Sequence, residues 1–215
     1  MTGHAAPAAS PRRHRARRGE GGRLREEILA AGTRLLLETG DEEAVSIRAV
    51  AQAVGVTPPS IYLHFADKTE LIYAICEELF RKLDGEMAAA AAGVDDPLEE
   101  LHRRGRAYVR FGLENAEAYR VLFMHHQDEV PESVDQKQLG DSPTFLHVVE
   151  AVQRCLDAGL LEPGDPMQIS IGLWVLVHGL TSLLISLPDF PWPESPERLV
   201  DRVFEHHLQG ILPRR

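Results

Sequence analysis

The sequence predicts an all-α protein in which a three-helix, helix-turn-helix domain precedes a larger helical domain. Three observations support this prediction. Apolar residues recur at the three- to four-residue spacing of helices through most of the chain. No segment alternates polar and apolar residues between turn signals, so strands are not expected. Proline and glycine stand between the periodic segments, where helices begin and end.

The first predicted helices form a compact N-terminal group. Apolar residues at helical spacing run from Arg23 to a terminating Gly40. Ser46 is placed to cap a short helix, and Gly55 follows that helix with a tight turn. The next short helix is residues 57–65, TPPSIYLHF, whose two prolines fall in its first turn, where proline is favourable.

The remaining helices are expected to build the second domain. Asp67 is an N-cap for the first of them. The predicted helices cover residues 68–92, 96–115, 117–124, 142–158, 166–187 and 195–212. The segments 142–158 and 166–187 are the best candidates for a dimer interface, because the second is apolar nearly all round and can face its own core and a partner. The expected domains are therefore residues 23–66 and 67–215.

Charge is distributed unevenly along the 215 residues, which indicates different partners for the two parts. The formal net charge is −10. Residues 1–70 hold ten Lys/Arg and nine Asp/Glu, or +1, whereas residues 71–215 hold thirteen and twenty-four, or −11. Residues 1–22 are rich in Ala, Pro, Gly and Arg and are predicted to be a disordered basic arm. Contact with DNA and simple solvation of this arm both stay open.

Composition favours a cytoplasmic protein. Hydrophobic residues make up 44% of the chain, enough for a packed core. Cys76 and Cys155 form no CxxC pair, which indicates packed thiols in a reducing setting. The N-terminus shows no apolar signal-peptide region. Residues 169–187 are long and apolar enough to span a membrane, but a helix buried on all sides within protein is the better interpretation, and no membrane partner is expected.

The stretch 57–65 has the features of a recognition helix. Two short helices joined by a glycine-containing turn, after a longer packing helix, describe a helix-turn-helix. Such a second helix enters the major groove by its N-terminal turn, where free amide groups and the helix dipole favour phosphate. Ile61 and Phe65 would anchor the helix, and Ser60, Tyr62 and His64 would face outward as donors. An ordinary packed helix is the alternative interpretation of this stretch by itself.

The run AVSIRAVAQAVGVTPPSIYLHFADKTEL resembles the DNA-binding domain of the TetR (tetracycline repressor) family of transcriptional regulators. The resemblance covers roughly residues 23–76 and implies a homodimer on a palindromic double-stranded DNA operator. The residues that it assigns to DNA binding are Arg25, Ser46, Thr57, Pro58, Pro59, Ser60, Tyr62, His64 and Lys68. Among them Ser46, Tyr62 and Lys68 would bind phosphates, and Thr57, Ser60 and His64 would lie at the groove. Pro58 stands where the family often has a polar base-reading residue, and proline can contact only a thymine methyl.

A second stretch, Trp174-Val-Leu-Val-His178-Gly179, resembles the Trp-x-x-x-His-Gly signature of one subgroup's effector domain. Trp174 and His178 share one helix face. The resemblance implies a cavity for a small-molecule effector of unknown identity, so the expected function is a repressor released from its operator by a small molecule. The candidate ligand-binding residues are Tyr108, Phe111, Phe123, Met124, Trp174 and His178, each of which is also a plausible core residue.

Patterns for catalysis and metal binding are weak. The histidine pairs at 125–126 and 206–207 have acids beside them, but adjacent histidines on a helix point about 100° apart. The sequence contains no H-E-x-x-H, no glycine-rich phosphate loop and no G-x-S-x-G. We therefore expect no enzyme, no metal and no cofactor. Two alternatives stay open: a helical binding protein whose helix-turn-helix no longer binds DNA specifically, and a membrane-tethered regulator.

Overall fold

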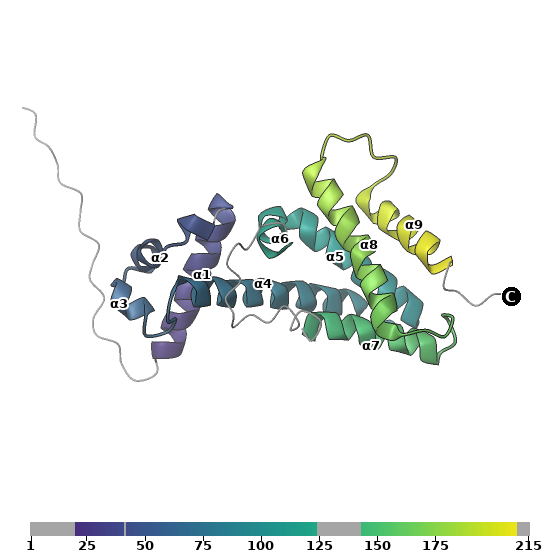
Figure 1. The fold of residues 1–215 in the computed structure, drawn as a ribbon, viewed down its shortest axis with the longest axis horizontal. Helices are drawn as coiled ribbons and strands as arrows, with labels where there is room; N and C mark the ends of the chain where they lie inside the picture. Colours follow the sequence, from purple (N-terminus) through teal and green to yellow (C-terminus); the bar gives the residue numbers. More distant parts are fainter. Residues whose placement is uncertain (1–19, 41, 124–142, 210–215) are drawn as a thin grey trace, which may run out of the picture. The chain divides into compact units, whose positions relative to one another are not determined.

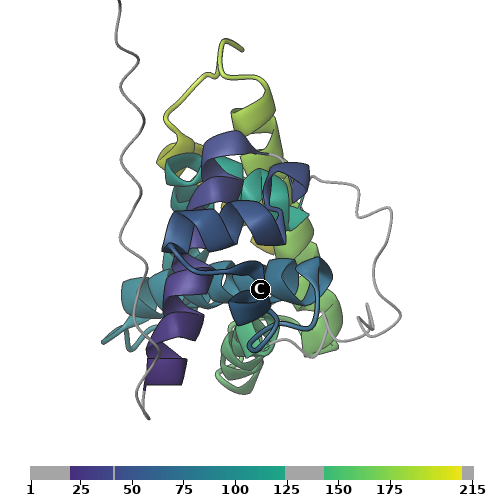
Figure 2. The ribbon, with the colours of Figure 1, turned by 90° about the vertical axis from the view of Figure 1, so that its left-hand side faces the viewer.

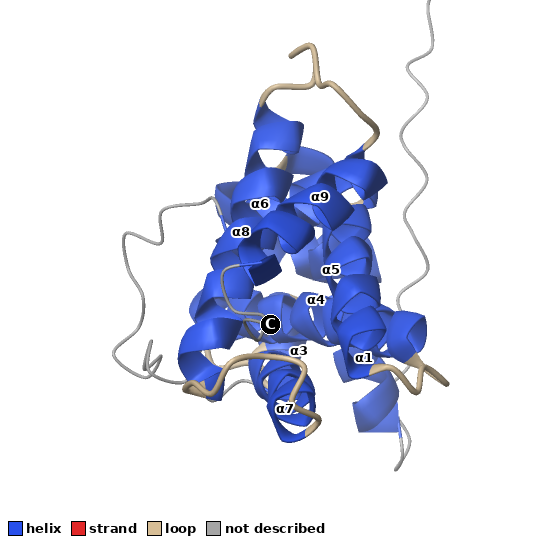
Figure 3. Cartoon of the chain, turned by 90° about the vertical axis from the view of Figure 1, so that its right-hand side faces the viewer, coloured by secondary structure: helices blue, strands red, loops and turns tan. Residues whose placement is uncertain are grey.

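The computed structural model describes residues 20–40, 42–123 and 143–209 (Figure 1). Within these ranges the regular structure is helical and no strand occurs (Figure 3), which confirms the predicted all-α class. The described residues form two compact units that divide between Glu77 and Glu78, inside one long helix.

The first unit is a small group of helices, coloured purple to blue in Figure 2. Its elements are α1 (Glu20–Thr39), a 3-10 turn η1 (Glu42–Ala44), α2 (Ile47–Val54), α3 (Pro58–Ile61) and the beginning of α4 (Lys68–Ala91). Helix α1 begins at Glu20, earlier than the predicted start at Arg23. The core consists of fully buried apolar side chains from each part of the unit: Ile28, Leu36, Val45, Val50, Ile61, Phe65, Leu71 and Ile75.

The turn between α2 and α3 has the predicted capping residues. The Ser46 hydroxyl accepts a hydrogen bond from the Ala49 N–H at 3.1 Å and so caps α2. Gly55 ends α2 with φ +79°, a left-handed conformation that suits glycine, and the Gly55 and Val56 N–H groups both reach the Ala51 carbonyl. These two residues fix where α2 begins and ends.

Helix α3 is shorter than predicted. Pro58 and Pro59 occupy its first turn as expected, but the helix covers only Pro58–Ile61. After Ile61 the chain continues as a tight turn, in which the His64 and Phe65 N–H groups both bond to the Ile61 carbonyl. Asp67 then caps α4 by accepting from the Glu70 N–H at 2.8 Å. The buried side chains of Ile61 and Phe65 hold this turn to the unit, so a longer α3 is not needed to position it.

The second unit contains the rest of α4 and a helical assembly around α5 (Pro97–Glu114). Helix α5 packs against α6 (Ala116–Phe123), α7 (Pro143–Asp157), α8 (Pro166–Ser186) and α9 (Pro196–Gln209). Asp96 and Asp165 cap α5 and α8, each followed by a proline in the first turn. The predicted ends of α6 at Met124 and α9 at Leu212 lie outside the described residues.

Two glycines allow the other helices to approach α5 closely. A Cβ on Gly105 would lie 2.5 Å from Cζ of Phe204 on α9. A Cβ on Gly112 would lie 2.3 Å from Cγ2 of Thr181 on α8. Both distances are well below van der Waals contact, so α9 and α8 sit against α5 at positions where no other residue fits without movement.

Helix α8 is the one described helix that is long and apolar enough to span a membrane. It packs against α5, α7 and α9 with Leu173, Val177 and Leu184 buried. The prediction that it is buried on all sides is wrong, because Ile171 and Val175 on another face are exposed, Val175 by 62%. Packing within a folded unit favours a core helix with one uncovered apolar face.

Candidate DNA-binding surface and ligand cavity

The segment 57–65 presents an exposed surface on a buried anchor. Ile61 and Phe65 are buried, whereas Thr57, Pro58 and Pro59 are exposed. Tyr62 is 54% exposed, and Ser60 and His64 are half-buried. Ile61 and Phe65 are therefore buried as expected, whereas of the three side chains expected to face outward only Tyr62 is exposed.

The hydroxyl groups on this surface are partly engaged. The Thr57 and Ser60 hydroxyl oxygens lie 3.1 Å apart, so one donates to the other and one hydroxyl proton of the pair stays available. Ser46 uses its oxygen as an acceptor for the α2 cap, which leaves its own proton free to donate to a phosphate. The Thr57–Ser60 bond also links the residue before α3 to the first turn of that helix.

Basic residues reach this region from two helices. The guanidinium of Arg25, on α1, lies 5.1 Å from the centroid of the Phe65 ring, a cation–π distance. Lys68 is the first residue of α4, beside the capping Asp67. Leu63, which was not among the predicted DNA contacts, is 82% exposed between Tyr62 and His64. The exposure of this apolar side chain is known only from the folded structure, so the sequence pattern could not identify it.

The second unit contains a cavity of about 240 Å³ with a largely apolar wall. All of α4 to α9 contribute to this wall. Three of the residues predicted to bind a ligand, Tyr108, Phe123 and Trp174, line it. The lining residues that the prediction missed are Phe80, Leu83, Met87, Leu101, Arg104, Gly105, Thr144, Phe145, Val148, Met167, Ile171, Leu173, Val177 and Phe204.

Phe111 and His178, which were also predicted to bind the ligand, do not line this cavity. Phe111 is fully buried in the core, and the Lys82 ammonium lies 5.6 Å from its ring centroid. His178 lies behind the wall, against the rings of Trp174 and Phe123 at 5.8 and 5.1 Å. Met124 lies outside the described residues.

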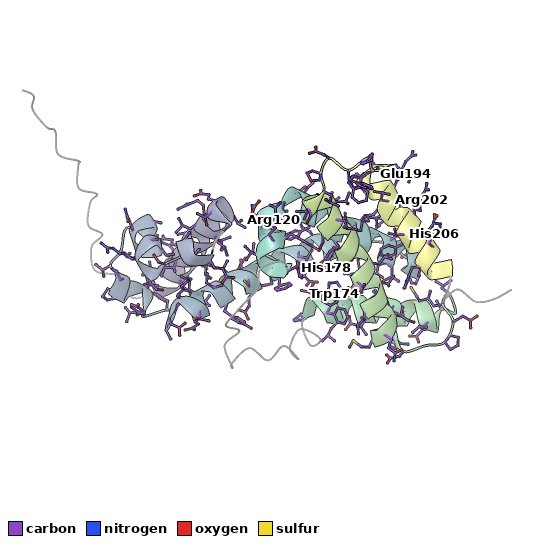
Figure 4. All side chains as sticks on the ribbon, turned by 45° about the horizontal axis from the view of Figure 1, so that its top comes forward. Arg120, Trp174, His178, Glu194, Arg202 and His206 are labelled. Carbon is purple, nitrogen blue, oxygen red and sulfur yellow. The ribbon has the colours of Figure 1, made fainter. Side chains whose placement is uncertain are left out.

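His178 is held by two tyrosines. The Tyr119 hydroxyl lies 2.7 Å from His178 Nδ1 and 3.1 Å from the His178 carbonyl oxygen. The Tyr108 hydroxyl lies 3.2 Å from the same Nδ1. Figure 4 shows Trp174 and His178 one turn apart on α8. Tyr119, on α6, was not predicted, since nothing in the sequence pairs it with a residue of α8.

Burial sets the protonation state of this group. Desolvation lowers the pKa of His178 and raises the pKa of Tyr119, so the imidazole and the phenol are both neutral at pH 7. A neutral imidazole with an unprotonated Nδ1 accepts from a tyrosine hydroxyl. The group therefore stabilises the aromatic wall of the cavity without introducing charge.

An ion cluster around the buried carboxylate of Glu100 adjoins the cavity. Glu100 on α5 accepts two hydrogen bonds from Arg154 Nη2, at 2.6 and 2.7 Å, and one from Arg104 Nε at 3.0 Å. Burial raises the pKa of Glu100, but the hydrogen bonds from Arg154 and Arg104 outweigh it, and the net pKa is lowered. Glu100 is therefore ionised, and two guanidinium groups share one carboxylate.

Metal and thiol chemistry find little support. Within residues 20–123 and 143–209 no group of three or more His, Cys, Asp or Glu side chains could hold a metal ion. The predicted pair at 125–126 lies outside these ranges. Cys76 and Cys155 are free, and burial raises their pKa values to about 12 and about 11, so both stay protonated and unreactive.

Comparison with known proteins agrees with this geometry. Residues 28–75 match the family model described as bacterial regulatory proteins, tetR family, and residues 101–207 match the tetracyclin repressor-like C-terminal domain. The chain is 26% identical over 149 residues to the HTH-type transcriptional activator FasR of Mycolicibacterium smegmatis, covering 69% of this chain and 66% of that relative.

Solved structures share the fold at low identity. A protein of unknown function from Rhodococcus sp. RHA1 has a TM-score of 0.75 at 21% identity, covering 88% of this chain and 96% of that one. The TetR family transcriptional regulator PfmR from Thermus thermophilus has a TM-score of 0.59 at 23% identity, covering 87% and 99%. With both the N-terminal and the C-terminal model matched, this chain belongs to the TetR family of DNA-binding transcriptional regulators and is not an enzyme.

Proposed function

We propose that this regulator is a homodimeric repressor that binds a palindromic operator and is released by a small molecule bound in the cavity of the second unit. The observation that supports DNA binding most directly is the segment 57–65. Its apolar side chains at 61 and 65 are buried, whereas Thr57, Pro58, Pro59 and Tyr62 are exposed beside them. Exposed residues on a buried anchor form a surface that suits docking against a rigid partner such as duplex DNA.

We further propose distinct roles for the residues of this surface. Ser46, Tyr62, Lys68 and Arg25 contact phosphates, and the exposed turn from Thr57 to His64 lies in the groove. Pro58 and Pro59 contribute apolar contact and leave hydrogen-bonded base reading to Ser60 and its neighbours.

A set of single substitutions tests these roles by DNA affinity at several salt concentrations. Lys68→Ala removes a charge and should weaken binding on all sequences, with the salt slope reduced by roughly 1. Ser60→Ala should cost about 1–3 kcal/mol on the operator and little on random DNA. Tyr62→Phe is the mildest change, since it removes one hydroxyl and keeps the ring. Indistinguishable effects of Lys68→Ala and Ser60→Ala would contradict the assignment, and intact binding in all three would remove 57–65 from the interface.

Dimerisation is proposed through the uncovered apolar face of α8. Ile171, Val175, Gly179 and Leu183 are spaced four residues apart, which places them on one ridge of the helix. The three large members of this ridge are exposed, and a Cβ on Gly179 would meet no atom within 4 Å. Such a ridge can pack into the grooves of a second copy, giving a bundle across a two-fold axis.

Light scattering of a Val175→Glu variant tests this interface. The buried charge should convert a dimer to a monomer at micromolar concentration, because an unpaired carboxylate is costly to bury. Ala89→Glu adds the same charge at an exposed position of α4 and should leave the dimer intact. A monomeric wild-type chain, or a dimer unaffected by Val175→Glu, would contradict this part of the proposal. If this ridge instead tethered the protein to a membrane, cell fractionation would recover the chain with the membranes.

The proposed switch depends on α4, a single helix that contributes Lys68 to the first unit and Phe80, Leu83 and Met87 to the cavity wall. A ligand that favours one arrangement of this helix must lower operator affinity, and operator DNA must lower ligand affinity by the same factor. Operator affinity measured with and without a bound ligand tests the switch, because a tightly bound ligand that left operator affinity unchanged would contradict it.

The direction of regulation is the part with a specific alternative. The relative FasR is named an activator, so activation by this chain is a second candidate. Transcription from a promoter carrying the operator separates the two. A repressor lowers transcription without its ligand and releases it with the ligand, whereas an activator raises transcription when bound.

A further inference from the structure

We propose that the cavity takes an amphipathic anion: one carboxylate-type group that Arg104 binds, attached to an apolar body of medium length. This inference rests on the proposed function, because it takes the cavity to be the effector site. It adds the chemical class of the effector and the residue that selects it.

Arg104 is the charged residue of the cavity wall. Its side chain is only 13% exposed, and its Nη1 atom is buried with no hydrogen-bond partner in the part of the chain that the structure describes. A guanidinium carries five N–H donors and keeps its charge at every accessible pH. A buried donor without an acceptor costs its full desolvation energy, so a ligand acceptor that reached Nη1 would recover that energy.

The charge count of the cluster points to an anionic acceptor. Glu100 is one negative charge between two guanidinium groups, which leaves the three residues with a net charge of +1. Arg154 Nη2 contacts both carboxylate oxygens of Glu100, and the Arg154 side chain is 47% exposed. The nearby Glu150 carboxylate also stabilises the positive charge of Arg154. The uncompensated charge therefore resides mainly on the deeper Arg104. One ligand carboxylate would neutralise it, whereas a dianion would introduce a second buried charge without a partner.

The rest of the wall requires an apolar body. Leu101, Gly105 and Tyr108 lie on the same stripe of α5 as Arg104, at helical spacing. The facing walls contain Met167, Trp174 and other apolar side chains of α8 and α4. The Tyr108 hydroxyl is already directed to His178, so it offers little to a second polar group of the ligand.

The volume limits the length of that body. At about 240 Å³ the cavity exceeds the roughly 150 Å³ of an engineered cavity that holds benzene. It falls just short of the roughly 300–1,000 Å³ of pockets that enclose drug-sized ligands. A medium-chain carboxylate such as decanoate matches this range, the charge of Arg104 and the apolar wall.

The test compares three probes that share one chain and differ in charge: decanoate, 1-decanol and decylammonium, at about pH 7.5, where a carboxylate is ionised. Binding is followed by fluorescence in a Trp192→Phe background, in which Trp174 of the cavity wall is the remaining tryptophan. We expect decanoate to bind at least about 10-fold more tightly than 1-decanol, since a charge-assisted hydrogen bond is available to the anion alone, and decylammonium to bind most weakly.

Variants assign that preference to Arg104. Arg104→Gln should abolish the preference for decanoate over 1-decanol while 1-decanol binding is kept, and Arg104→Lys should retain part of it. Arg103→Gln is the matched control, because Arg103 is the neighbouring residue, is 45% exposed and pairs with Glu99. It should bind all three probes as the parent does. Circular dichroism checks folding, and if Arg104→Gln does not fold, the probe ranking in the parent and in Arg104→Lys decides.

Several results would overturn the inference: equal binding of decanoate and 1-decanol, a preference that survives Arg104→Gln, or no binding of any probe. These outcomes are separate from those that test the proposed function, because no DNA is present. If decanoate binds through Arg104 but leaves operator affinity unchanged, the inference stands and the cavity is not the switch. If another compound releases the operator while the three probes bind alike, the proposed function stands and the inference fails.

Discussion

Replacing Tyr119 by phenylalanine should destabilise the second unit more than the same change at Tyr108. The Tyr119 hydroxyl is fully buried and lies 2.7 Å from His178 Nδ1 and 3.1 Å from the His178 carbonyl oxygen. The Tyr108 hydroxyl has one described bond, at 3.2 Å, to the same Nδ1. Removing a buried hydrogen-bonding hydroxyl costs about 1–3 kcal/mol when its partner is left unsatisfied.

The two tyrosines can substitute for each other at His178 Nδ1, which sets the magnitudes. After Tyr119→Phe, Tyr108 still serves Nδ1, so we expect a loss of about 1–2 kcal/mol in the free energy of unfolding. After Tyr108→Phe, the shorter bond from Tyr119 persists, and the loss should stay below about 1 kcal/mol. The double variant leaves Nδ1 with neither donor, so its loss should exceed the sum of the single losses.

Urea unfolding of the two single variants and the double variant measures this coupling, with the denaturant slope checked for constancy. The mutations remove one oxygen each and keep the aromatic packing of Tyr108 and Tyr119, which lie edge-to-face with centroids 6.1 Å apart. Strictly additive losses would show that the tyrosines do not share an acceptor. A larger loss from Tyr108→Phe than from Tyr119→Phe would reverse the geometry on which the reasoning depends.

Four further outcomes are expected from the structure. Gly112→Ala should lower the free energy of unfolding by about 1–3 kcal/mol in thermal unfolding, because its Cβ would lie 2.3 Å from Thr181 Cγ2. Gly85 is a helical position with open space around it, so Gly85→Ala should raise the free energy of unfolding by about 0.4–1 kcal/mol. Ile61→Ala should lose about 2–5 kcal/mol from the first unit, measured in the same way. Burial lowers the pKa of His178, so as the pH falls the unfolded chain binds this proton before the folded chain does. The free energy of unfolding should therefore decrease as the pH drops below about 6.5. Urea unfolding at several pH values should show that His178→Gln loses part of this dependence.

The helices were predictable because their ends have local causes. Ser46, Asp96 and Asp165 each accept a backbone N–H of the helix that they begin, and Gly55 ends α2 in a conformation that favours glycine. Such signals act within a few residues and can be read in sequence. The end of α3 has no such signal. It depends on the burial of Phe65 against the rest of its unit, a tertiary contact that periodicity does not reveal.

The cavity was predicted in kind and only partly in its residues. Tyr108 and Phe111 are buried and Phe123 and Trp174 are half-buried, but burial does not say which side chain faces a void. Tyr108, Phe123 and Trp174 reach the cavity, whereas Phe111 is packed away from it on the same helix as Tyr108. A difference of three positions on a helix is less than one turn, so helix rotation and the neighbouring helices decide between the two roles.

Arg104 shows why the charged residue of the cavity could not be read from sequence. It belongs to the run Arg103-Arg104-Gly105-Arg106, and Arg103 and Arg104 each follow a glutamate by four residues, so local rules give both the same surface ion pair. In the structure Arg103 pairs with Glu99 at an exposed position, and Arg106 reaches Asp201 on α9 at 2.6 Å. Successive residues on a helix point about 100° apart. With Arg106 directed to α9 and Arg103 directed to solvent, Arg104 lies on the inner side of α5. There Glu100 also pairs with the guanidinium of Arg154 on α7, 54 positions along the chain. Because of this distant contact, Arg104 keeps a buried donor without a partner and a charge that Glu100 does not fully neutralise.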